Sequence, residues 1–395
     1  MIEVTTEVCG CREEGNKLCC TLESIQPSPV TEDYRNKCEF SVGLHRDSLL
    51  PTVGFRLSSY RQGSMSVAEP VDCWIVPPAM TKLAATFQEY IRQNSQLEVF
   101  NPETYQGYWR GLTARTSRGG DLLVIVVMHP QSLSEEDIDA EKKKLKEYFE
   151  CGSGKKCGVT SLWLHLFDKR RAEGEQEHSL FHLSGNKGLT EELLGLKFHV
   201  APEAFFQVNT AGAEVLYNQV GKLLEVGPST VVLDICCGTG TIGLSLAKQH
   251  VQRVIGIELC SQAVQNAKLN AQVNGHDNHE VTNAQFVCGR AEDSIYNVLQ
   301  AVPASSEAVA ILDPPRAGLN NKVVKALRGC TQLNKLVYIA CNPAGALNNM
   351  VDLCRATSKS YRGEPFYPVK AVPVDLFPHT QHCELAVLFQ RRSPQ

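Results

Sequence analysis

Short apolar runs rich in β-branched residues alternate with segments of helical periodicity from about residue 198 to the end of the chain. Strands that alternate with helices in this way predict βαβ units and a mostly parallel sheet. The expected strands are 231–235, 253–259, 284–288, 308–313, 336–340, 367–374 and 384–392, and the expected helices are 242–249, 261–274, 292–300, 321–328 and 344–354.

The chain before residue 198 has a less regular pattern. It predicts strands at 38–44, 52–57, 122–128 and 161–167, helices at 80–93 and 134–149, and an exposed charged loop at 168–188. We therefore expect three parts, which are a leading segment at 1–33, an α/β central domain at 34–197 and a C-terminal α/β domain at 198–395.

Composition is that of an ordinary globular protein, with 43% hydrophobic and 21% charged residues in a chain of 395. No apolar run is long enough to cross a bilayer. The first residues have neither the order of a secretory signal nor the arginine-rich character of a transit peptide. These features favour a cytoplasmic or nuclear protein with no membrane partner, and they leave a mitochondrial location open.

The net charge of −4 excludes the strongly basic field of a general nucleic-acid binder. Any contact with RNA must therefore use local patches. The candidates are Arg110, Arg115, Arg118, the stretch 142–146, Lys155 and Lys156. The lysine run at 142–146 is better interpreted as the solvated face of a helix.

Sixteen cysteines are many for this length. Several fall in segments expected to be buried, which favours reduced thiols over a disulfide framework. These are Cys260, Cys288, Cys330 and Cys354. A second group near the amino terminus lacks the paired C-x2-C spacing of zinc and iron–sulfur sites, so we expect no bound metal or iron–sulfur cluster. It comprises Cys9, Cys11, Cys19, Cys20 and Cys38.

A glycine-rich turn follows the expected strand at 231–235. Gly238, Gly240 and Gly243 form a G-x-G-x-x-G motif between strand and helix, where glycines allow a sharp turn and close approach of a ligand. Glu258 ends the next strand and is placed to accept hydrogen bonds from both hydroxyls of a ribose. NAD and S-adenosylmethionine both fit this pattern, and a tight turn without a ligand is the alternative.

Two features favour S-adenosylmethionine. Asp234 lies one residue before the end of the first strand, as an acid often does in methyltransferases. The fourth strand ends in Asp313-Pro314-Pro315-Arg316, whose prolines form a rigid turn without backbone donors and direct the aspartate into the pocket. Many enzymes that methylate exocyclic nitrogens have an aromatic residue in the place of Arg316, so the pattern disfavours that chemistry.

The expected strand at 336–340 is followed by Cys341 and a turn at Asn342-Pro343. A thiol at the carboxyl end of an α/β strand faces the crevice in which ligands bind. A thiolate can add to C6 of a pyrimidine, which makes C5 nucleophilic enough to attack the methyl group of a sulfonium. The C5 proton must then be removed by a base within hydrogen-bond reach. We interpret Cys341 as the nucleophile.

The loop FPHTQHCE at 377–384 supplies the candidate bases. Glu384 is our choice for the proton acceptor, and a surface carboxylate is the alternative interpretation. His382 is better interpreted as a hydrogen-bonded residue of the turn.

Together these motifs resemble those of the RNA (uracil-5-)-methyltransferases of the TrmA/RumA type, and more closely the animal members, of the homolog A type. The likeness runs from about Tyr34 to Arg391. It is carried by YRNKCEFSVG (34–43), APEAFFQVNTAGAEVLY (201–217), LDICCGTGTIGLSLA (233–247), LDPPRAGL (312–319), CNP (341–343) and LFPHTQHCE (376–384). The resemblance implies an α/β fold with a doubly wound, Rossmann-like class I S-adenosylmethionine-dependent methyltransferase domain, preceded by a smaller α/β RNA-binding domain.

The resemblance also implies roles for single residues. Cys341 matches the family's nucleophile and Glu384 its proton acceptor. Arg316 is expected to contact phosphate or base, and Asp313 also lies where the family contacts uracil. The residues that match cofactor contacts are Gln207, Gly238, Thr241, Glu258 and Asp313. The chain departs from the family at Ala340, where a serine is usual, and at Cys236, where bacterial members have an aromatic residue.

The expected function is S-adenosylmethionine-dependent C5-methylation of uridine in RNA, by a monomer. The resemblance points to the T-loop uridine at position 54 of tRNA, which would become 5-methyluridine. One alternative is a ribosomal-RNA uridine methyltransferase, and another is a non-catalytic tRNA-binding or tRNA-folding protein that retains the fold. A dehydrogenase is a third alternative, but it leaves the turns at Asp313 and Cys341 unexplained.

Overall fold

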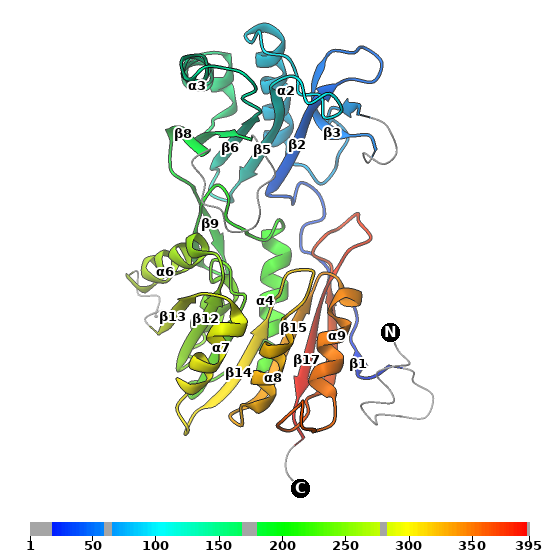
Figure 1. Ribbon diagram of the computed structural model, residues 1–395, viewed down its shortest axis with the longest axis vertical. Coiled ribbons are helices and arrows are strands. Elements are labelled where there is room, and N and C mark those ends of the chain that lie inside the picture. Colours follow the sequence, from blue (N-terminus) through cyan, green and yellow to red (C-terminus); the bar gives the residue numbers. More distant parts are fainter. Residues whose placement is uncertain (1–17, 59–64, 168–179, 277–282, 393–395) are drawn as a thin grey trace. The chain divides into compact units, whose positions relative to one another are not determined.

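The computed structural model describes residues 18–58, 65–167, 180–276 and 283–392, and it divides the chain into two compact units (Figure 1). Among the described residues, the C-terminal unit comprises 18–30, 193–198 and those from 204 to 392, and the central unit comprises those from 31 to 192 and 199–203. Of the expected leading segment, residues 18–30 thus belong to the C-terminal unit and 31–33 to the central unit, and residues 1–17 lie outside the described part of the chain. The domain boundaries expected at 33/34 and 197/198 stay predictions, because a compact unit is not yet a domain that folds alone.

An eight-stranded sheet forms the centre of the C-terminal unit, in the order β1-β16-β17-β15-β14-β11-β12-β13. All its pairings are parallel except those of β17, which is antiparallel to both neighbours. The strand order reverses between β11 and β14, which is the kind of position where open α/β sheets bind ligands. The strands are β1 (Thr21–Leu22), β11 (Thr230–Ile235), β12 (Arg253–Glu258), β13 (Ala284–Cys288), β14 (Glu307–Leu312), β15 (Leu333–Ala340), β16 (Tyr367–Val374) and β17 (Glu384–Gln390).

Helices cover both faces of this sheet (Figure 1). One layer contains α7 (Ala291–Gln300), α8 (Asn321–Gly329) and α9 (Pro343–Cys354). The other layer contains α4 (Thr210–Leu224), α5 (Thr241–Ala247) and α6 (Ser261–His276). The predicted doubly wound, Rossmann-like arrangement is confirmed.

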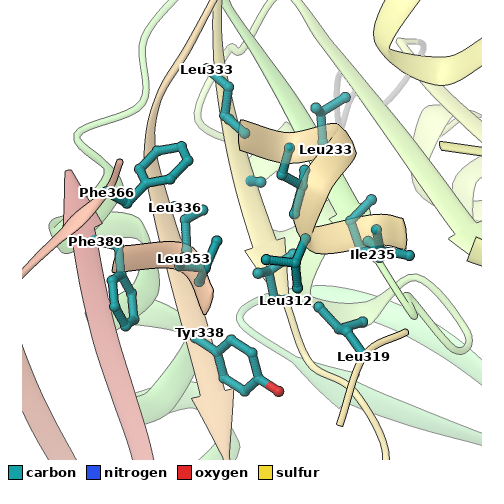
Figure 2. Close-up of a cluster of buried hydrophobic side chains, with 14 of the residues drawn as sticks. Leu233, Ile235, Leu312, Leu319, Leu333, Leu336, Tyr338, Leu353, Phe366 and Phe389 are labelled. Atoms are coloured by element: carbon teal, nitrogen blue, oxygen red, sulfur yellow. The ribbon is translucent and has the colours of Figure 1, made fainter. Parts of the chain in front are cut away.

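An apolar core fills the space between the sheet and the layer of α7, α8 and α9 (Figure 2). Leu233, Leu312 and Leu336 come from three neighbouring strands, and each is fully buried. Leu353 of α9 is equally buried. Parallel strands covered on both faces need apolar residues at successive positions, which explains the continuous runs in the sequence.

The central unit contains a seven-stranded sheet in the order β4-β3-β2-β5-β6-β7-β8, in which only β6 and β7 pair in parallel. The strands are β2 (Lys37–Leu44), β3 (Pro51–Arg56), β4 (Val67–Ala68), β5 (Trp109–Thr116), β6 (Leu122–Met128), β7 (Ser161–Leu166) and β8 (Leu180–Gly185). The helices are α2 (Pro78–Gln93), α3 (Glu135–Glu150) and the 3-10 turn η2 (Ser153–Cys157). A separate two-stranded ladder pairs β9 (Leu189–Leu193) with β10 (Leu196–Val200).

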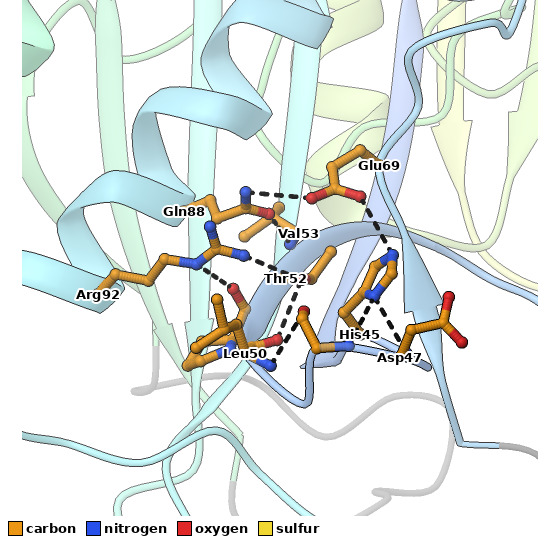
Figure 3. A network of polar contacts seen from close by, with 10 residues as sticks. His45, Asp47, Leu50, Thr52, Val53, Glu69, Gln88 and Arg92 are labelled. Atoms are coloured by element: carbon orange, nitrogen blue, oxygen red, sulfur yellow. Dashed lines mark hydrogen bonds and ion pairs between the residues drawn. The ribbon is translucent and has the colours of Figure 1, made fainter.

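Polar side chains join α2 to the edge of this sheet (Figure 3). Gln88 accepts a hydrogen bond from the Val53 backbone N–H at 2.9 Å and donates to Glu69 at 3.3 Å. Arg92 donates to the Pro51 carbonyl at 2.7 Å. These bonds satisfy backbone groups that the short strand β4 leaves unpaired, and they fix α2 over the sheet.

The lysine run at 142–146 lies on α3. Ser134 and Asp137 form a capping box that begins this helix. Lys142 pairs with Asp139 at 2.9 Å, and its Nζ lies 3.8 Å from the centre of the Phe181 ring. Lys143, Lys144 and Lys146 are exposed, which agrees with the interpretation of this run as a solvated helix face.

Several elements differ from the expectation. Strand β8 occupies part of the expected loop at 168–188, and residues 168–179 lie outside the described part of the chain. Strand β5 was not expected, because Arg110, Gly111 and Arg115 interrupt its apolar pattern. Helix α4 was not expected, because Gly212 and Gly221 lower helix propensity by about 1 kcal/mol each.

The interpretation of Arg115 as an RNA contact is wrong. Its side chain is only 2% exposed, and burial lowers its pKa to about 10. Cys330 and Cys354 are buried as expected, whereas Cys260 and Cys288 are exposed. All the cysteines in the described part of the chain are free thiols. Cys9 and Cys11 lie outside it.

The core packing generates a stability prediction. We expect Leu336→Ala to lower the free energy of unfolding by about 2–5 kcal/mol, because it leaves a cavity in a fully buried position. Leu259→Ala is the matched control, since Leu259 is 58% exposed in the same unit. Urea denaturation of the two variants measures the difference, and equal midpoints would contradict the described core.

Candidate active site

The register of the parallel strands brings four chain segments to one edge of the C-terminal sheet. Ile235 of β11 pairs with Ile257 of β12 and with Leu312 of β14, and Leu312 pairs with Tyr338 of β15. The residues that follow these strands therefore meet at their carboxyl ends. The candidates from the sequence at this edge are Cys236, Gly238, Glu258, Asp313 and Cys341.

The candidate nucleophile and the candidate base are cross-strand neighbours. The last residue pair between β15 and β17 joins Ala340 to Leu385. In an antiparallel ladder the next position places Cys341 opposite Glu384, so their side chains are on the same face of the sheet. Glu384 is the first residue of β17 and is 5% exposed, whereas Cys341 is exposed.

Each glycine of the nucleotide motif has its own structural reason. Gly238 and Gly240 have φ values of +54° and +79°, which strongly favour glycine. A Cβ on Gly238 would meet nothing within 4 Å, whereas one on Gly240 would lie 2.8 Å from the Phe286 ring. A Cβ on Gly243 would lie 2.8 Å from an Asp234 oxygen. The turn is therefore packed against the protein on one side and open at Gly238.

Two carboxylates hold this turn. Asp234 Oδ2 accepts a hydrogen bond from the Gly243 N–H at 2.9 Å, and burial raises the Asp234 pKa to about 7. Its other oxygen, Oδ1, is buried without a hydrogen-bond partner among the described residues. Glu258 accepts from the Gly238 N–H at 3.0 Å and from the Cys260 N–H at 2.9 Å. Asp234 thus binds the end of the turn that enters α5, and Glu258 binds its open end at Gly238.

The turn after β14 is fastened to α9. Asn349, a buried residue of α9, exchanges two hydrogen bonds with the Leu319 backbone, at 2.7 and 2.9 Å. Its Oδ1 also accepts from the Tyr338 hydroxyl of β15 at 3.0 Å. A Cβ on Gly345 would lie 2.8 Å from the Arg316 carbonyl, so the turn packs closely against the first turn of α9. Asn349 therefore sets the position of the Asp313–Arg316 turn relative to Cys341.

The first turn of α9 follows Cys341 directly. Asn342 is the N-cap, whose side chain accepts from the Gly345 N–H at 3.4 Å, and Pro343 occupies the first helical position. The positive end of the helix dipole thus lies beside the thiol and favours its ionised form.

The segment before α4 is anchored by Asn209. Its side chain accepts from the Gly212 N–H at 2.8 Å and donates to Ser28 at 3.0 Å and to the Leu376 carbonyl at 3.1 Å. Gln207, the expected cofactor contact, is buried two residues earlier. Phe205, beside it, is 67% exposed.

Thr241 lies at the first turn of α5. Its hydroxyl is 3.2 Å from the hydroxyl of Tyr217, a buried residue of α4. This contact ties the glycine turn to the segment anchored by Asn209.

His382 lies in the loop before β17. It is exposed, and its backbone N–H donates to the Thr380 hydroxyl at 3.2 Å, which agrees with the interpretation of His382 as a hydrogen-bonded residue of that loop.

The acidic groups of the site hold their protons to unusually high pH. Burial, with the nearby Asp313 charge, raises the Glu384 pKa to about 8, and burial raises the Asp313 pKa to about 7. The pKa of the Cys341 thiol is also raised, mainly by burial and then by Glu384. Arg316 acts in the opposite direction, because its hydrogen bond and its charge stabilise the thiolate. The ionisation of the Cys341 thiol thus depends on the charges of Glu384, Asp313 and Arg316.

Asn209, Asn349, Phe205 and Tyr217 were not predicted as parts of the site. Only Asn209 had a signal in the sequence, because an asparagine directly before a helical segment is a common N-cap.

Among the described residues, no group of three or more His, Cys, Asp or Glu side chains is arranged to hold a metal ion. None of the helices in the described part of the chain has the length and hydrophobicity of a membrane span.

The sequence of this chain is similar to those of known proteins. The family model for tRNA (Uracil-5-)-methyltransferase matches residues 192–392. The mouse tRNA (uracil-5-)-methyltransferase homolog A is 47% identical over 96% of this chain and 61% of its own length. The human homolog B is 42% identical over 99% of this chain and 76% of its own length. The chain thus spans about three-fifths of the homolog A relative.

A solved structure shares the fold. The Pyrococcus abyssi tRNA (uracil-54, C5)-methyltransferase, solved in complex with S-adenosyl-L-homocysteine, superposes with a TM-score of 0.68. The match covers 98% of this chain and 81% of that chain at 21% identity. With the family model and the relatives above, the similarity leads to one conclusion: this chain belongs to the tRNA (uracil-5-)-methyltransferase family.

Proposed function

We propose that the chain is an S-adenosylmethionine-dependent enzyme that methylates C5 of a uridine in tRNA. The observation that carries this proposal is the cross-strand placement of Cys341 and Glu384 beside the Asp313 turn. A nucleophile and a base on one face of the sheet suit a reaction that needs both in sequence. The proposed target is the T-loop uridine at position 54, in line with the family resemblance.

The glycine turn has the features that this cofactor needs. The open side of Gly238, the Glu258 carboxylate at the strand end and the buried Gln207 fit a nucleoside with an amino-acid tail. Gly238, Glu258, Gln207, Thr241 and Asp313 are the residues proposed to hold it. When bound, S-adenosylmethionine supplies an electrophilic methyl group.

The chemistry begins with Cys341. Its thiolate forms a bond to C6 of uracil, and the electron pair of the C5–C6 double bond moves towards C5 and O4. Arg316 favours the thiolate. The family resemblance supports a role for Asp313, a buried acid with a raised pKa, in binding the uracil edge. C5 then accepts the methyl group and becomes tetrahedral, with both a proton and the new methyl group attached.

Glu384 completes the cycle. Its carboxylate removes the C5 proton, the C5–C6 double bond forms again, and the C6–S bond breaks to return the Cys341 thiolate. A raised pKa makes Glu384 a stronger base than an ordinary carboxylate, which suits removal of a carbon-bound proton. The products are 5-methyluridine in the RNA and the demethylated cofactor.

A stacked uridine must leave its stack to reach this site, at a cost of a few kcal/mol. The exposed Phe205 offers a ring on which the extruded base can stack. The central unit is proposed to hold the RNA. There, the guanidinium of Arg110, a candidate phosphate contact, lies 3.8 Å from the centre of the Phe167 ring, which orients it.

The first test uses tRNA that contains 5-fluorouridine. Fluorine at C5 cannot leave as a proton does, so we expect a protein–RNA adduct that survives a denaturing gel and maps to Cys341. Cys341→Ala must abolish the adduct. Cys383→Ala is the matched control, because Cys383 is a partly buried thiol beside Glu384. A wild-type protein that binds tRNA but forms no adduct would be a non-catalytic binder.

The second test separates the two catalytic roles. We expect Glu384→Gln to reduce turnover of ordinary tRNA about 10²–10⁴-fold, because the C5 proton has no acceptor. The variant retains Cys341, so the methylated adduct should accumulate and be visible by denaturing electrophoresis with labelled cofactor. Loss of turnover without adduct would place Glu384 earlier in the reaction or outside it.

The third test concerns pH. Glu384 must be ionised to accept a proton, and the Cys341 thiol must be ionised to attack, and both pKa values are raised. We therefore expect kcat/KM to rise with pH throughout the range from about pH 6 to about pH 9, by about a hundredfold per pH unit well below pH 8, where both groups are protonated, and by about tenfold per unit above the Glu384 pKa of about 8, where only the thiol still holds its proton. Initial rates between about pH 6 and pH 9 measure this dependence, and a flat profile is incompatible with Glu384 as the base.

A further inference from the structure

A cationic surface begins beside the site and continues along α8. Asn320 caps α8 by accepting from the Lys322 N–H at 3.0 Å, so the helix starts where the Asp313 turn ends. Lys322 and Lys325 are one helical turn apart on one side of the helix. We call the complete set the α8 track; it consists of Lys322, Lys325, Arg355, Lys359 and Arg362.

A buried arginine holds the far end of this track. Arg328 donates to the carbonyls of Asp352 at 3.2 Å and of Gly363 at 3.0 Å, and also to that of Arg355. Gly363 has φ of +77°, and a Cβ there would lie 1.9 Å from the Arg328 carbonyl. The backbone of the loop that carries Lys359 and Arg362 is therefore fastened to the end of α8 at Gly363.

An aromatic ring lies among these cations. The Tyr361 hydroxyl accepts from the Asn321 side chain at 2.9 Å. The ring centre lies 5.2 Å from the Lys325 ammonium and 5.7 Å from the Arg355 guanidinium. The Ser358 N–H donates to the Tyr361 carbonyl at 2.9 Å, which closes the turn between them. The Tyr361 ring thus keeps Lys325 and Arg355 close together despite their repulsion.

The charge of the track is not neutralised locally. Arg355 pairs with Asp352 at 2.5 Å, but Lys322, Lys359 and Arg362 have no carboxylate partner in the described part of the chain. The acids that face the track are Asp352, Glu364 at its far end, and Glu292, which accepts from Asn320 and pairs with Arg290. An excess of fixed positive charge in a protein of net charge −4 indicates an anionic partner.

We propose that the α8 track binds the phosphate backbone of the RNA substrate next to the nucleotide that enters the site. This inference rests on the proposed function. The nine residues of α8 span about 14 Å. The track thus extends along α8 from the edge of the sheet that holds the candidate site towards the opposite edge, and the proposed phosphate contacts lie along it. These contacts position the RNA and carry no base specificity.

The test compares three proteins with full-length tRNA. In Lys359→Ala/Arg362→Ala we expect about tenfold weaker binding at moderate salt, and a slope of log K against log salt that is smaller by about 2. KM for tRNA should rise, while kcat at saturating tRNA stays unchanged. Lys268→Ala is the matched control, because Lys268 is an exposed lysine of α6 in the opposite helix layer, and it should behave as wild type.

Two outcomes would overturn the inference. One is a double variant with the wild-type tRNA affinity and salt slope, and the other is an equal loss of affinity in Lys268→Ala. The fluorouridine adduct keeps this result separate from the proposed function. If wild type forms the Cys341 adduct and the double variant binds tRNA normally, only the role of the track is wrong. If wild type forms no adduct, the proposed function itself is wrong.

Discussion

The antiparallel ladder between β15 and β17 is the constraint on which the site depends. It is the feature that places Glu384, which follows Cys341 by more than forty residues of chain, directly opposite the thiol. A slip of the ladder by one residue would turn Glu384 to the other face of the sheet. Both strands are buried at most successive positions, so a slip would move each side chain into a space shaped for a different one. Core packing thus maintains the alignment of Cys341 with Glu384.

Three hydrogen-bonded junctions then fix the surroundings of this pair. Asn349 joins the Asp313 turn to β15 and α9, and Asn209 joins the segment of Gln207 to the loop before Glu384. Asp234 holds the glycine turn. Each junction uses a buried polar side chain that hydrogen-bonds segments next to the strand ends, so these segments are held to the core.

The sequence predicted the parallel sheet well, because strands buried on both faces carry continuous apolar runs with glycine or proline turns at their ends. For the same reason Gly238, Asp313 and Cys341 could be placed at strand ends. The pairing of Cys341 with Glu384 could not be predicted, because register arises from contacts between distant segments. Asn349 gave no signal, since a buried asparagine is recognised only by its tertiary partners. Strand β5 was missed because its pattern includes the buried Arg115.

The raised pKa of Cys341 has a consequence for the protein at rest. Oxidants such as peroxide, and alkylating reagents, attack the thiolate far faster than the neutral thiol. The burial and the acidic neighbour that raise this pKa therefore protect an exposed cysteine from damage. The environment that raises the Cys341 pKa thus keeps the sulfur in its less reactive, protonated form.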